Sequence, residues 1–218
     1  KRVEWLPNGV DIDCFSNGNG QRFRSKHGIP QESKMLLCVS RIDYQKNQLA
    51  LVEMMRSLMT RHHDAHLVLI GPVTIESYHM KIVECIERLG LSNQVTLLPG
   101  LPTGSAELVD AYHAADVFCL PSRHEPFGIV VLEAWAAGLP VVASDIGGIP
   151  TFTKDGEDVL HIDPEDSATI VTAVDALLSN KQLRAKLTEN GLKKARNRFD
   201  WSRISERLAS IYQDIRTH

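Results

Sequence analysis

Residues 117–143 read VFCLPSRHEPFGIVVLEAWAAGLPVVA, and this stretch decides the fold. It holds two short apolar runs, Val117 to Leu120 and Pro140 to Ala143, of the kind that forms fully buried strands. Between them Pro126 and Gly128 mark a turn, and the apolar residues that follow indicate a helix. A strand, a helix and a second strand in this order predict a parallel βαβ unit.

The same alternation continues in both directions along the chain. Four further apolar runs predict strands, namely Met35 to Val39, His66 to Ile70, Val95 to Leu98 and Val159 to Ile162. After Lys46 and after Pro164, apolar residues recur at the spacing of an amphipathic helix, and we expect Asp163 to cap the second of these helices. The chain is therefore predicted to be an α/β protein with a Rossmann-like parallel sheet covered by helices on both faces, and to be nearly all helical from Glu165 onward.

Charge and cysteine usage exclude several classes of protein. The 218 residues carry 24 Lys and Arg against 27 Asp and Glu, a net charge of −3 without basic clusters, so no nucleic-acid or anionic-membrane partner is predicted. The four cysteines are scattered without a CxxC pair, which is typical of reduced thiols and favours a cytoplasmic location. No apolar run approaches the ~18 residues of a transmembrane helix, so no transmembrane segment is predicted.

The two ends of the chain suggest a piece of a longer protein. The sequence begins at Lys1 without a methionine and enters a strand-like run from Val3 to Leu6. At the other end, a helix is predicted from about Trp201. Its apolar face consists of Ile204, Leu208, Ile211 and Ile215. We accordingly divide the chain into a sheet domain, 1–200, and a C-terminal helix, 201–218.

The loops that follow the predicted strands hold the candidate site, because ligands of a parallel sheet bind beyond the carboxyl ends of its strands. Arg41 stands at the end of the run Met35 to Val39, and Lys46 at the start of the next helix, so both cations are predicted to face one crevice. Arginine supplies a planar fork and lysine a point charge, a combination suited to a diphosphate. The alternative that each is a solvated surface charge stays open.

A second loop, from Pro121 to Gly128, leads into a helix whose first N–H groups and positive dipole end form an anion site. Glu125 precedes this helix and Glu133 lies within it, so the two carboxylates are predicted to lie on opposite sides of a bound diphosphate. Carboxylates there can accept hydrogen bonds from sugar hydroxyls, which a nucleotide sugar carries on both sides of its diphosphate. For either glutamate alone, helix capping or a surface salt bridge is the alternative.

With these motifs assembled, the chain resembles the C-terminal, donor-binding half of the retaining glycosyltransferases of family 4, also called group 1, which have the GT-B fold. The resemblance rests on Ser40-Arg41 to Lys46-Asn47, on the E-x7-E spacing from Glu125 to Glu133, and on Gly147-Gly148-Ile149-Pro150. It extends over nearly the whole chain. Thr151 stands where family members often carry Glu, and Gly71-Pro72-Val73 lacks a commonly seen second glycine, so local loop shapes depart from the family pattern.

The resemblance implies a role for each candidate residue. Arg41 and Lys46 would hold the donor diphosphate and stabilise the charge on the leaving nucleotide. Glu125 would accept hydrogen bonds from the donor sugar, and Glu133 from the ribose. The remaining contacts to the donor would come from the backbone of Phe127, Gly128, Ile129 and Val130, and from a base-binding loop with Leu98 and Gly100.

The resemblance also implies the reaction. A hexosyl group from a UDP-, GDP- or ADP-hexose would pass with retention to a sugar, glycan or small-molecule acceptor held by a missing N-terminal domain, to which the C-terminal helix would cross. The fragment alone would be inactive, and no cofactor or protein nucleophile is expected. A GT-B relative that isomerises nucleotide sugars, such as a 2-epimerase, and a non-catalytic nucleotide-sugar binding module stay open as alternatives.

Two weaker patterns carry no site. Asp11-Ile12-Asp13 imitates the metal-binding DxD of another glycosyltransferase fold but lies at the chain entry, so no metal is predicted. His62, His63 and His66 are predicted to lie on a solvated face at a helix end.

The absence of GxGxxG after a strand and of GxxxxGK[ST] excludes the usual dehydrogenases and P-loop proteins.

Overall fold

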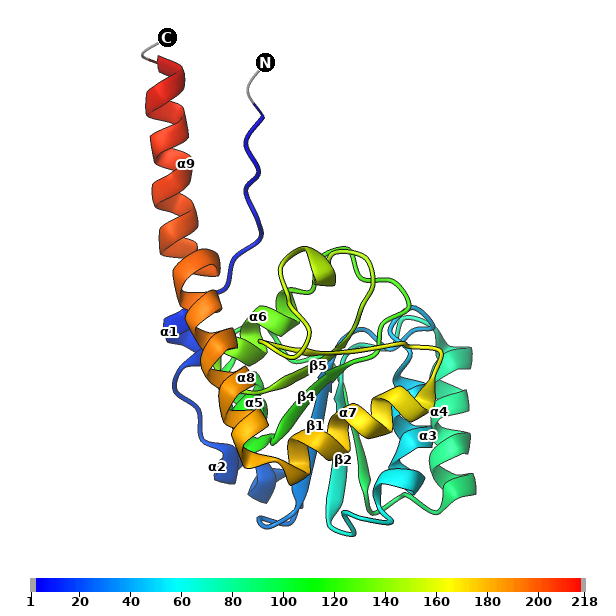
Figure 1. The fold of residues 1–218 in the computed structure, drawn as a ribbon. Helices are drawn as coiled ribbons and strands as arrows, with labels where there is room; N and C mark the ends of the chain where they lie inside the picture. Colours follow the sequence, from blue (N-terminus) through cyan, green and yellow to red (C-terminus); the bar gives the residue numbers. More distant parts are fainter. Residues whose placement is uncertain (1–2, 217–218) are drawn as a thin grey trace.

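The chain folds around one parallel sheet (Figure 1). The computed structural model describes residues 3–216, with the side chains of residues 215 and 216 left out. The strands are β1 (Lys34–Val39), β2 (Ala65–Ile70), β3 (Val95–Leu98), β4 (Val117–Leu120), β5 (Val141–Ser144) and β6 (Leu160–Ile162). Their order in the six-stranded sheet is β3-β2-β1-β4-β5-β6, and every pairing is parallel. All the strands predicted along this sheet are confirmed to within one residue at each end.

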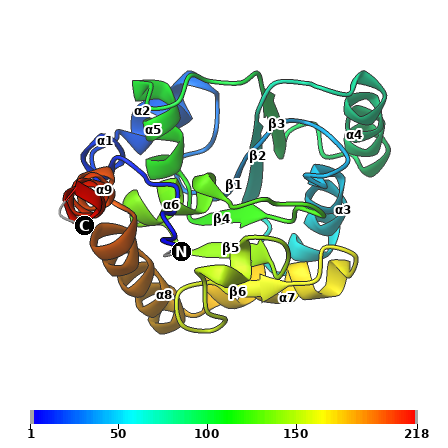
Figure 2. The same cartoon turned by 90° about the horizontal axis from the view of Figure 1, so that it is seen from above.

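Helices cover both faces of the sheet, as predicted. They are α1 (Ile12–Phe15), α2 (Gly20–Lys26), α3 (Gln48–Leu58), α4 (Glu76–Leu89), α5 (Ala106–Ala114), α6 (Ile129–Ala136), η1 (Ile149–Thr151), α7 (Ser167–Ser179), α8 (Lys181–Lys194), η2 (Ala195–Phe199) and α9 (Trp201–Arg216). Seen from above, α2, α5 and α6 lie on one side of the sheet and α3, α4 and α7 on the other (Figure 2). The nearly all-helical part after Glu165 is also confirmed.

The two-sided burial explains why the strands are continuous apolar runs. In β1, Met35 and Leu37 pack into the cluster on the α5 and α6 side, whereas Leu36 and Cys38 pack into the cluster of α3, α4 and α7. Successive side chains of a strand point to opposite faces, so a strand that is covered twice needs an apolar residue at every position.

Two local predictions were wrong. Val3 to Leu6 forms no strand, because Val3 and Trp5 are exposed and the first backbone pairing of the described chain is a single bridge between Val10 and Asp200. Asp163 does not cap α7. A turn closed by the Asp166 N–H to the Asp163 carbonyl moves the helix start forward, and Asp166 caps it by accepting from the Ala168 N–H.

The histidine prediction was wrong for two of the three residues, whereas His63 is exposed just after the end of α3, as predicted. The His62 ring contacts Asp175 of α7 at 2.8 Å, and only 14% of its side chain is exposed. His66 lies inside β2, where its ring meets the Thr96 hydroxyl of β3 at 2.8 Å. The three residues therefore do not share a helix end, since β2 begins at Ala65 and takes His66 into the sheet.

The C-terminal helix begins at Trp201, as predicted, and rises from the body beside the N-terminal segment, on the side of the sheet where η1 lies (Figure 1). Ile204 is buried, Leu208 is 37% exposed and Ile211 is half-buried. The side chain of Ile215 lies outside the described residues. No helix within residues 3–216 is both long and apolar enough to cross a membrane. All four cysteines are free thiols, as predicted.

Candidate functional site

The loops that follow β1, β4 and β5 are hydrogen-bonded to one another at the carboxyl edge of the sheet. The backbone N–H groups of Arg123 and His124 donate to the Gln45 carbonyl at 2.7 and 3.3 Å, and the Gly148 N–H donates to the Glu125 carbonyl at 2.8 Å. These bonds join the two loops singled out from the sequence into one surface with the loop after β5.

Two of the predicted site residues meet directly. Lys46 Nζ lies 2.7 Å from Glu125 Oε2, and the two residues are only 9% and 7% exposed. Lys46 Nζ also lies 3.5 Å from the His124 carbonyl, and the Ser122 hydroxyl lies 3.5 Å from Glu125 Oε2. Residues 79 positions apart thus form a nearly buried ion pair at the edge where a ligand is expected.

Arg41 has a different partner. Its side chain is 54% exposed, and Nη2 lies 3.3 Å from Asp43 Oδ2. Asp43 is almost wholly buried, and its Oδ1 accepts hydrogen bonds from the Gln45 and Lys46 N–H groups at 2.9 and 3.1 Å. Asp43 therefore both shapes the loop and orients the guanidinium. The sequence analysis missed it, although an aspartate that bonds backbone two residues ahead is a known turn former.

The turn from Glu125 to Gly128 is pressed against the loop after β5. A Cβ on Gly147 would overlap the Glu125 carbonyl, and one on Gly148 would lie 2.7 Å from the Phe127 Cα. Gly147 also has a φ of +60°, in the left-handed region that glycine enters without strain. The two glycines therefore let the loops approach closely enough for the hydrogen bond from Gly148 to Glu125.

The start of α6 is left without a side-chain cap. Gly128 occupies the N-cap position at a φ of +99°, and no side chain accepts from the first turn of the helix. The Phe127 ring stacks on Phe152 at 5.0 Å, whereas Ile129 is 43% exposed and Val130 is half-buried. An uncapped helix N-terminus is a ready site for an anion, and the nearly buried cation Lys46, from the loop after β1, pairs with Glu125 on the turn that precedes this helix.

Glu133, in the second turn of α6, is held from α5 rather than by the loop after β1. It is 5% exposed, and its Oε2 accepts a hydrogen bond of 2.6 Å from the Tyr112 hydroxyl of α5. Burial raises the pKa of Glu133, and the Tyr112 hydrogen bond opposes that rise. The two glutamates of the E-x7-E spacing are therefore held by different partners, Lys46 and Tyr112. The sequence analysis did not single out Tyr112, and its neighbourhood in the sequence carries no signal for this contact.

The predicted base-binding loop borders an apolar cavity of about 210 Å³. Leu98 lines it together with Ile42, Pro72 and Val73, and a Cβ on Gly100 would lie 2.7 Å from Pro72 Cδ. The cavity lies at the carboxyl ends of β2 and β3, next to the loop that carries Arg41. Leu98 and Gly100 thus sit at the same edge of the sheet as the predicted phosphate-binding residues.

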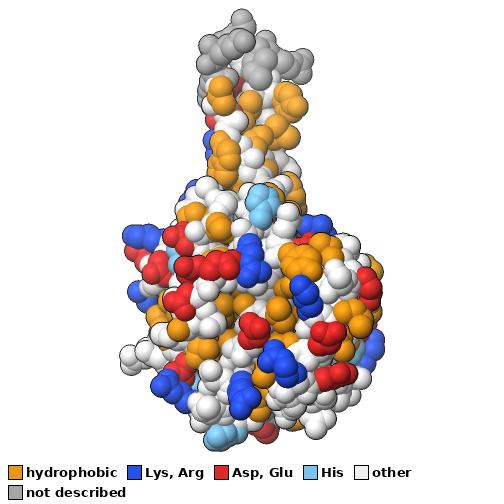
Figure 3. Space-filling model, turned by 90° about the vertical axis from the view of Figure 1, so that its right-hand side faces the viewer, with side chains coloured by type: hydrophobic (Ala, Val, Ile, Leu, Met, Phe, Trp, Pro, Cys, Tyr) orange, Lys and Arg blue, Asp and Glu red, His pale blue; other side chains and the backbone are white. Residues whose placement is uncertain are grey.

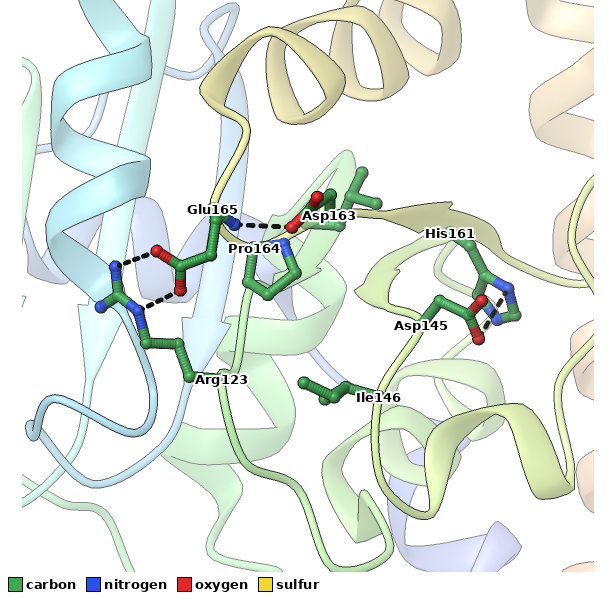
Figure 4. Close-up of a pocket in the computed structure, with 8 residues that line it drawn as sticks. Arg123, Asp145, Ile146, His161, Asp163, Pro164 and Glu165 are labelled. Atoms are coloured by element: carbon green, nitrogen blue, oxygen red, sulfur yellow. Dashed lines mark hydrogen bonds and ion pairs between the residues drawn. The ribbon is translucent and has the colours of Figure 1, made fainter.

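A larger cavity of about 540 Å³ lies at the ends of β5 and β6 (Figure 4). Arg123 forms a paired contact with both carboxylate oxygens of Glu165 on one side, at 2.5 and 3.2 Å, and Asp145 faces His161 on the other. Only Arg123 of these residues lies in a predicted loop of the site. Within the described residues, no three His, Cys, Asp or Glu side chains are grouped as a metal site, and Asp11 serves as the N-cap of α1.

Comparison with known proteins identifies relatives along the whole chain. The sequence model described as glycosyl transferases group 1 matches residues 19–194. D-inositol 3-phosphate glycosyltransferase of Corynebacterium glutamicum (strain R) is 32% identical over 224 residues, which cover 98% of this chain and 52% of that protein. This chain thus spans about half the length of the relatives it matches.

Solved structures show the same fold. HepE of Anabaena, crystallised with UDP and glucose, matches with a TM-score of 0.87 at 24% identity, over 97% of this chain and 57% of that one. The C-terminal domain of LpcC, a group 1 glycosyl transferase of Francisella tularensis, matches with a TM-score of 0.77 at 26% identity, over 88% of this chain and 100% of that domain. The fold is that of the C-terminal, Rossmann-like half of a GT-B glycosyltransferase, and the chain belongs to the glycosyl transferases of group 1.

Proposed function

We propose that this chain is the nucleotide-sugar-binding half of a retaining family 4 glycosyltransferase that transfers a hexosyl group. The observation that carries the proposal is the nearly buried ion pair between Lys46, from the loop after β1, and Glu125, on the turn before the uncapped N-terminus of α6. A cation beside a helix N-terminus suits the diphosphate, and a carboxylate beside the cation suits the hydroxyls of the sugar attached to it.

Each residue then has a task in the reaction. Lys46 and Arg41, together with the N–H groups of residues 127–130, bind the diphosphate and stabilise the charge that grows on it as the bond to the anomeric carbon breaks. Glu125 holds the sugar, Glu133 holds the ribose, and the loop at Leu98 and Gly100 holds the base. The acceptor oxygen forms the new bond to the anomeric carbon on the face the nucleotide leaves, and its proton passes to the departing phosphate.

The acceptor belongs to the half of the protein that precedes this chain. Trp5 of the N-terminal segment and Leu208 and Tyr212 of α9 are exposed apolar side chains, and hydrophobic side chains are visible along the projecting part of the molecule (Figure 3). We propose that α9 crosses to that half and that these side chains pack against it. This chain alone would then bind nucleotide weakly and transfer nothing.

A thermal-shift panel tests the donor site. We expect UDP, GDP or ADP, or one of their hexose conjugates, to raise the melting temperature, since ligand at 100 times its Kd stabilises a protein by about 2.7 kcal/mol. UDP and UDP-glucose lead the panel because HepE was crystallised with UDP and glucose. The Lys46→Ala variant should lose a charge-assisted contact of roughly 1.5–3 kcal/mol, about 10- to 100-fold in Kd.

Lys193→Ala is the matched control, because Lys193 is an exposed lysine of α8 and its loss should leave the shift unchanged. Equal shifts for Lys46→Ala and the parent would contradict the site. For the full-length protein, conversion of the donor sugar without acceptor would instead indicate an epimerase. D-inositol 3-phosphate is the first acceptor to test with the full-length protein, since it is named for the relative in Corynebacterium glutamicum.

A further inference from the structure

The hydrogen bond between Tyr112 and Glu133 is the starting point. The Tyr112 hydroxyl donates to Glu133 Oε2 at 2.6 Å, and the two residues are 1% and 5% exposed. An O–H donor at this distance from a carboxylate forms a short, charge-assisted hydrogen bond, which is stronger than one between neutral groups. The contact therefore fixes one of the two carboxylate oxygens.

Tyr112 has little freedom to follow a moving partner. Its ring lies edge-on to Phe15 at 5.5 Å and tilted against Phe118 of β4 at 5.7 Å. All three rings are nearly inaccessible to solvent. Close packing on several sides holds a side chain in one rotamer, so the hydroxyl is a fixed point in the core of the domain.

The second oxygen of Glu133 remains available. Within the described residues, the deeply buried side-chain oxygens and nitrogens that lack a hydrogen bond are limited to Gln48 Oε1. Glu133 Oε1 forms no hydrogen bond with a described group and is not among those atoms, so it retains contact with solvent. One oxygen is thus held by Tyr112, and the other keeps a small accessible surface on a side chain that is otherwise buried.

We propose that Tyr112 is a positioning residue for nucleotide recognition, which holds Glu133 so that its free oxygen accepts a hydrogen bond from the ribose. This inference rests on the proposed function, in which Glu133 contacts the ribose. Tyr112 fixes the carboxylate through the oxygen that Glu133 does not offer to the ligand, and Tyr112 itself does not contact the ligand. Tyr112 is thus a specificity determinant for nucleotides with ribose hydroxyls.

The pH dependence of nucleotide binding reports on the protonation of Glu133. A purely structural role of Tyr112 would leave this pH dependence unchanged. Burial raises the pKa of Glu133, and the hydrogen bond from Tyr112 lowers it. Among the described residues, the Cys14 thiol of α1 also interacts electrostatically with Glu133, and the Cys38 thiol of β1 interacts with Tyr112. Lys194 of α8 lies over the Trp135 ring. Removal of the Tyr112 hydroxyl should therefore raise the pKa further and leave more of the carboxyl protonated, and unable to accept as a carboxylate, at mildly acidic pH.

The test is the Tyr112→Phe variant, which keeps the ring and removes the hydroxyl. Titration calorimetry measures the binding of UDP and of 2′,3′-dideoxy-UDP to the chain. If the thermal-shift panel selects another base, the corresponding GDP or ADP pair replaces them. We expect UDP to bind about 5- to 10-fold more weakly to the variant and the dideoxy form less than 2-fold more weakly. The loss for UDP should grow as the pH falls from 8 to 6. In a Glu133→Gln background, Tyr112→Phe should cause no further loss of ribose selectivity.

Tyr78→Phe is the matched control, because Tyr78 is equally buried and its hydroxyl accepts from the Leu49 N–H, away from Glu133. Equal weakening of both nucleotides by Tyr112→Phe, or unchanged UDP binding, would overturn the inference. If Glu133→Gln itself fails to reduce the preference for UDP over its dideoxy form, the proposed role of Glu133 fails instead.

A measurement on the parent chain covers the case in which Tyr112→Phe does not fold. The hydroxyl proton of Tyr112 is buried in a short hydrogen bond and should give a slowly exchanging NMR signal. UDP should shift this signal strongly and the dideoxy form weakly. Equal shifts by both nucleotides would overturn the inference.

Discussion

At the scale of single residues, the main feature of the site is that its charges are already paired. Glu125 lies against Lys46, and Asp43 lies against Arg41. A carboxylate beside a cation reduces the attraction of that cation for a diphosphate, and it repels the diphosphate directly. We expect this arrangement to limit the affinity for a nucleoside diphosphate and to favour ligands whose sugar hydroxyls can bond to Glu125.

Glu125→Gln should therefore bind the nucleoside diphosphate more tightly. Removal of the negative charge from the Lys46 pair should gain about 1 kcal/mol after screening, or about fivefold in Kd. Calorimetry measures the Kd for the diphosphate and the Kd for its hexose conjugate. The preference for the conjugate over the diphosphate should be smaller in the variant than in the parent. Glu165→Gln, the same change of charge at an exposed partner of Arg123, should alter neither value appreciably. Weaker binding of the diphosphate by Glu125→Gln would contradict the charge argument.

At the scale of elements, the orientation of α6 depends on its contact with α8. The Trp135 ring of α6 is fully buried and lies against Gly191 of α8, where an added Cβ would come within 2.5 Å of the indole nitrogen. The same nitrogen donates to the Asp158 carbonyl at 3.1 Å, which keeps the ring in place. A glycine inside a helix is thus required here by packing rather than by a turn.

Gly191→Ala should destabilise the domain, although alanine normally stabilises a helix interior by roughly 0.5–1 kcal/mol relative to glycine. Overpacking against the fixed indole should outweigh that gain and cost a net ~1–3 kcal/mol. Urea unfolding at 25 °C measures the change. Glu189→Ala, at an exposed position of the same helix, is the control and should lie within about 0.5 kcal/mol of the parent. If the Gly191→Ala variant is more stable than the parent, α6 and α8 can move apart enough to accommodate the methyl group, which would contradict the overpacking argument.

At the scale of the whole molecule, a compact body carries a helix that extends away from it. Charged side chains of both signs are spread over the body, whereas hydrophobic side chains follow the projecting part (Figure 3). Ile204 is the buried anchor at its base, packed close to Gly9. The backbone of Val10 reinforces this junction by bonding to Phe199 and to Trp201.

A stop after Arg207 should change the free energy of unfolding of this chain by less than about 1 kcal/mol, because residues 208–214 bury little surface on the body. Ile204→Ala in the untruncated chain should cost about 2–3 kcal/mol, since it removes a buried side chain from a packed junction. Chemical denaturation of the two variants compares them directly. A large loss on truncation, with little effect of Ile204→Ala, would mean that the distal part of α9 contributes to the stability of the body.

Much of the fold was predictable because strands covered on both faces leave an unbroken apolar run, which is a local signal. The run Val117 to Leu120 and the turn at Gly128 were sufficient for the βαβ unit. Local signals failed at Val3 to Leu6, where a strand-like run does not join the sheet. They also failed at Asp163, because a turn separates this residue from the start of α7 at Ser167.

The sequence by itself determined the parallel α/β fold, the loops that carry the candidate site and the residues Arg41, Lys46, Glu125 and Glu133, since periodicity and strand ends are encoded by neighbours in the chain. Only the tertiary structure decided how those residues are partnered: Lys46 with Glu125, Arg41 with Asp43, and Glu133 with Tyr112. The longest of these contacts joins residues 79 positions apart. The physical reason is that an ion pair or hydrogen bond depends on how the loops and helices pack at the edge of the sheet, and that packing leaves no trace in the spacing of the sequence.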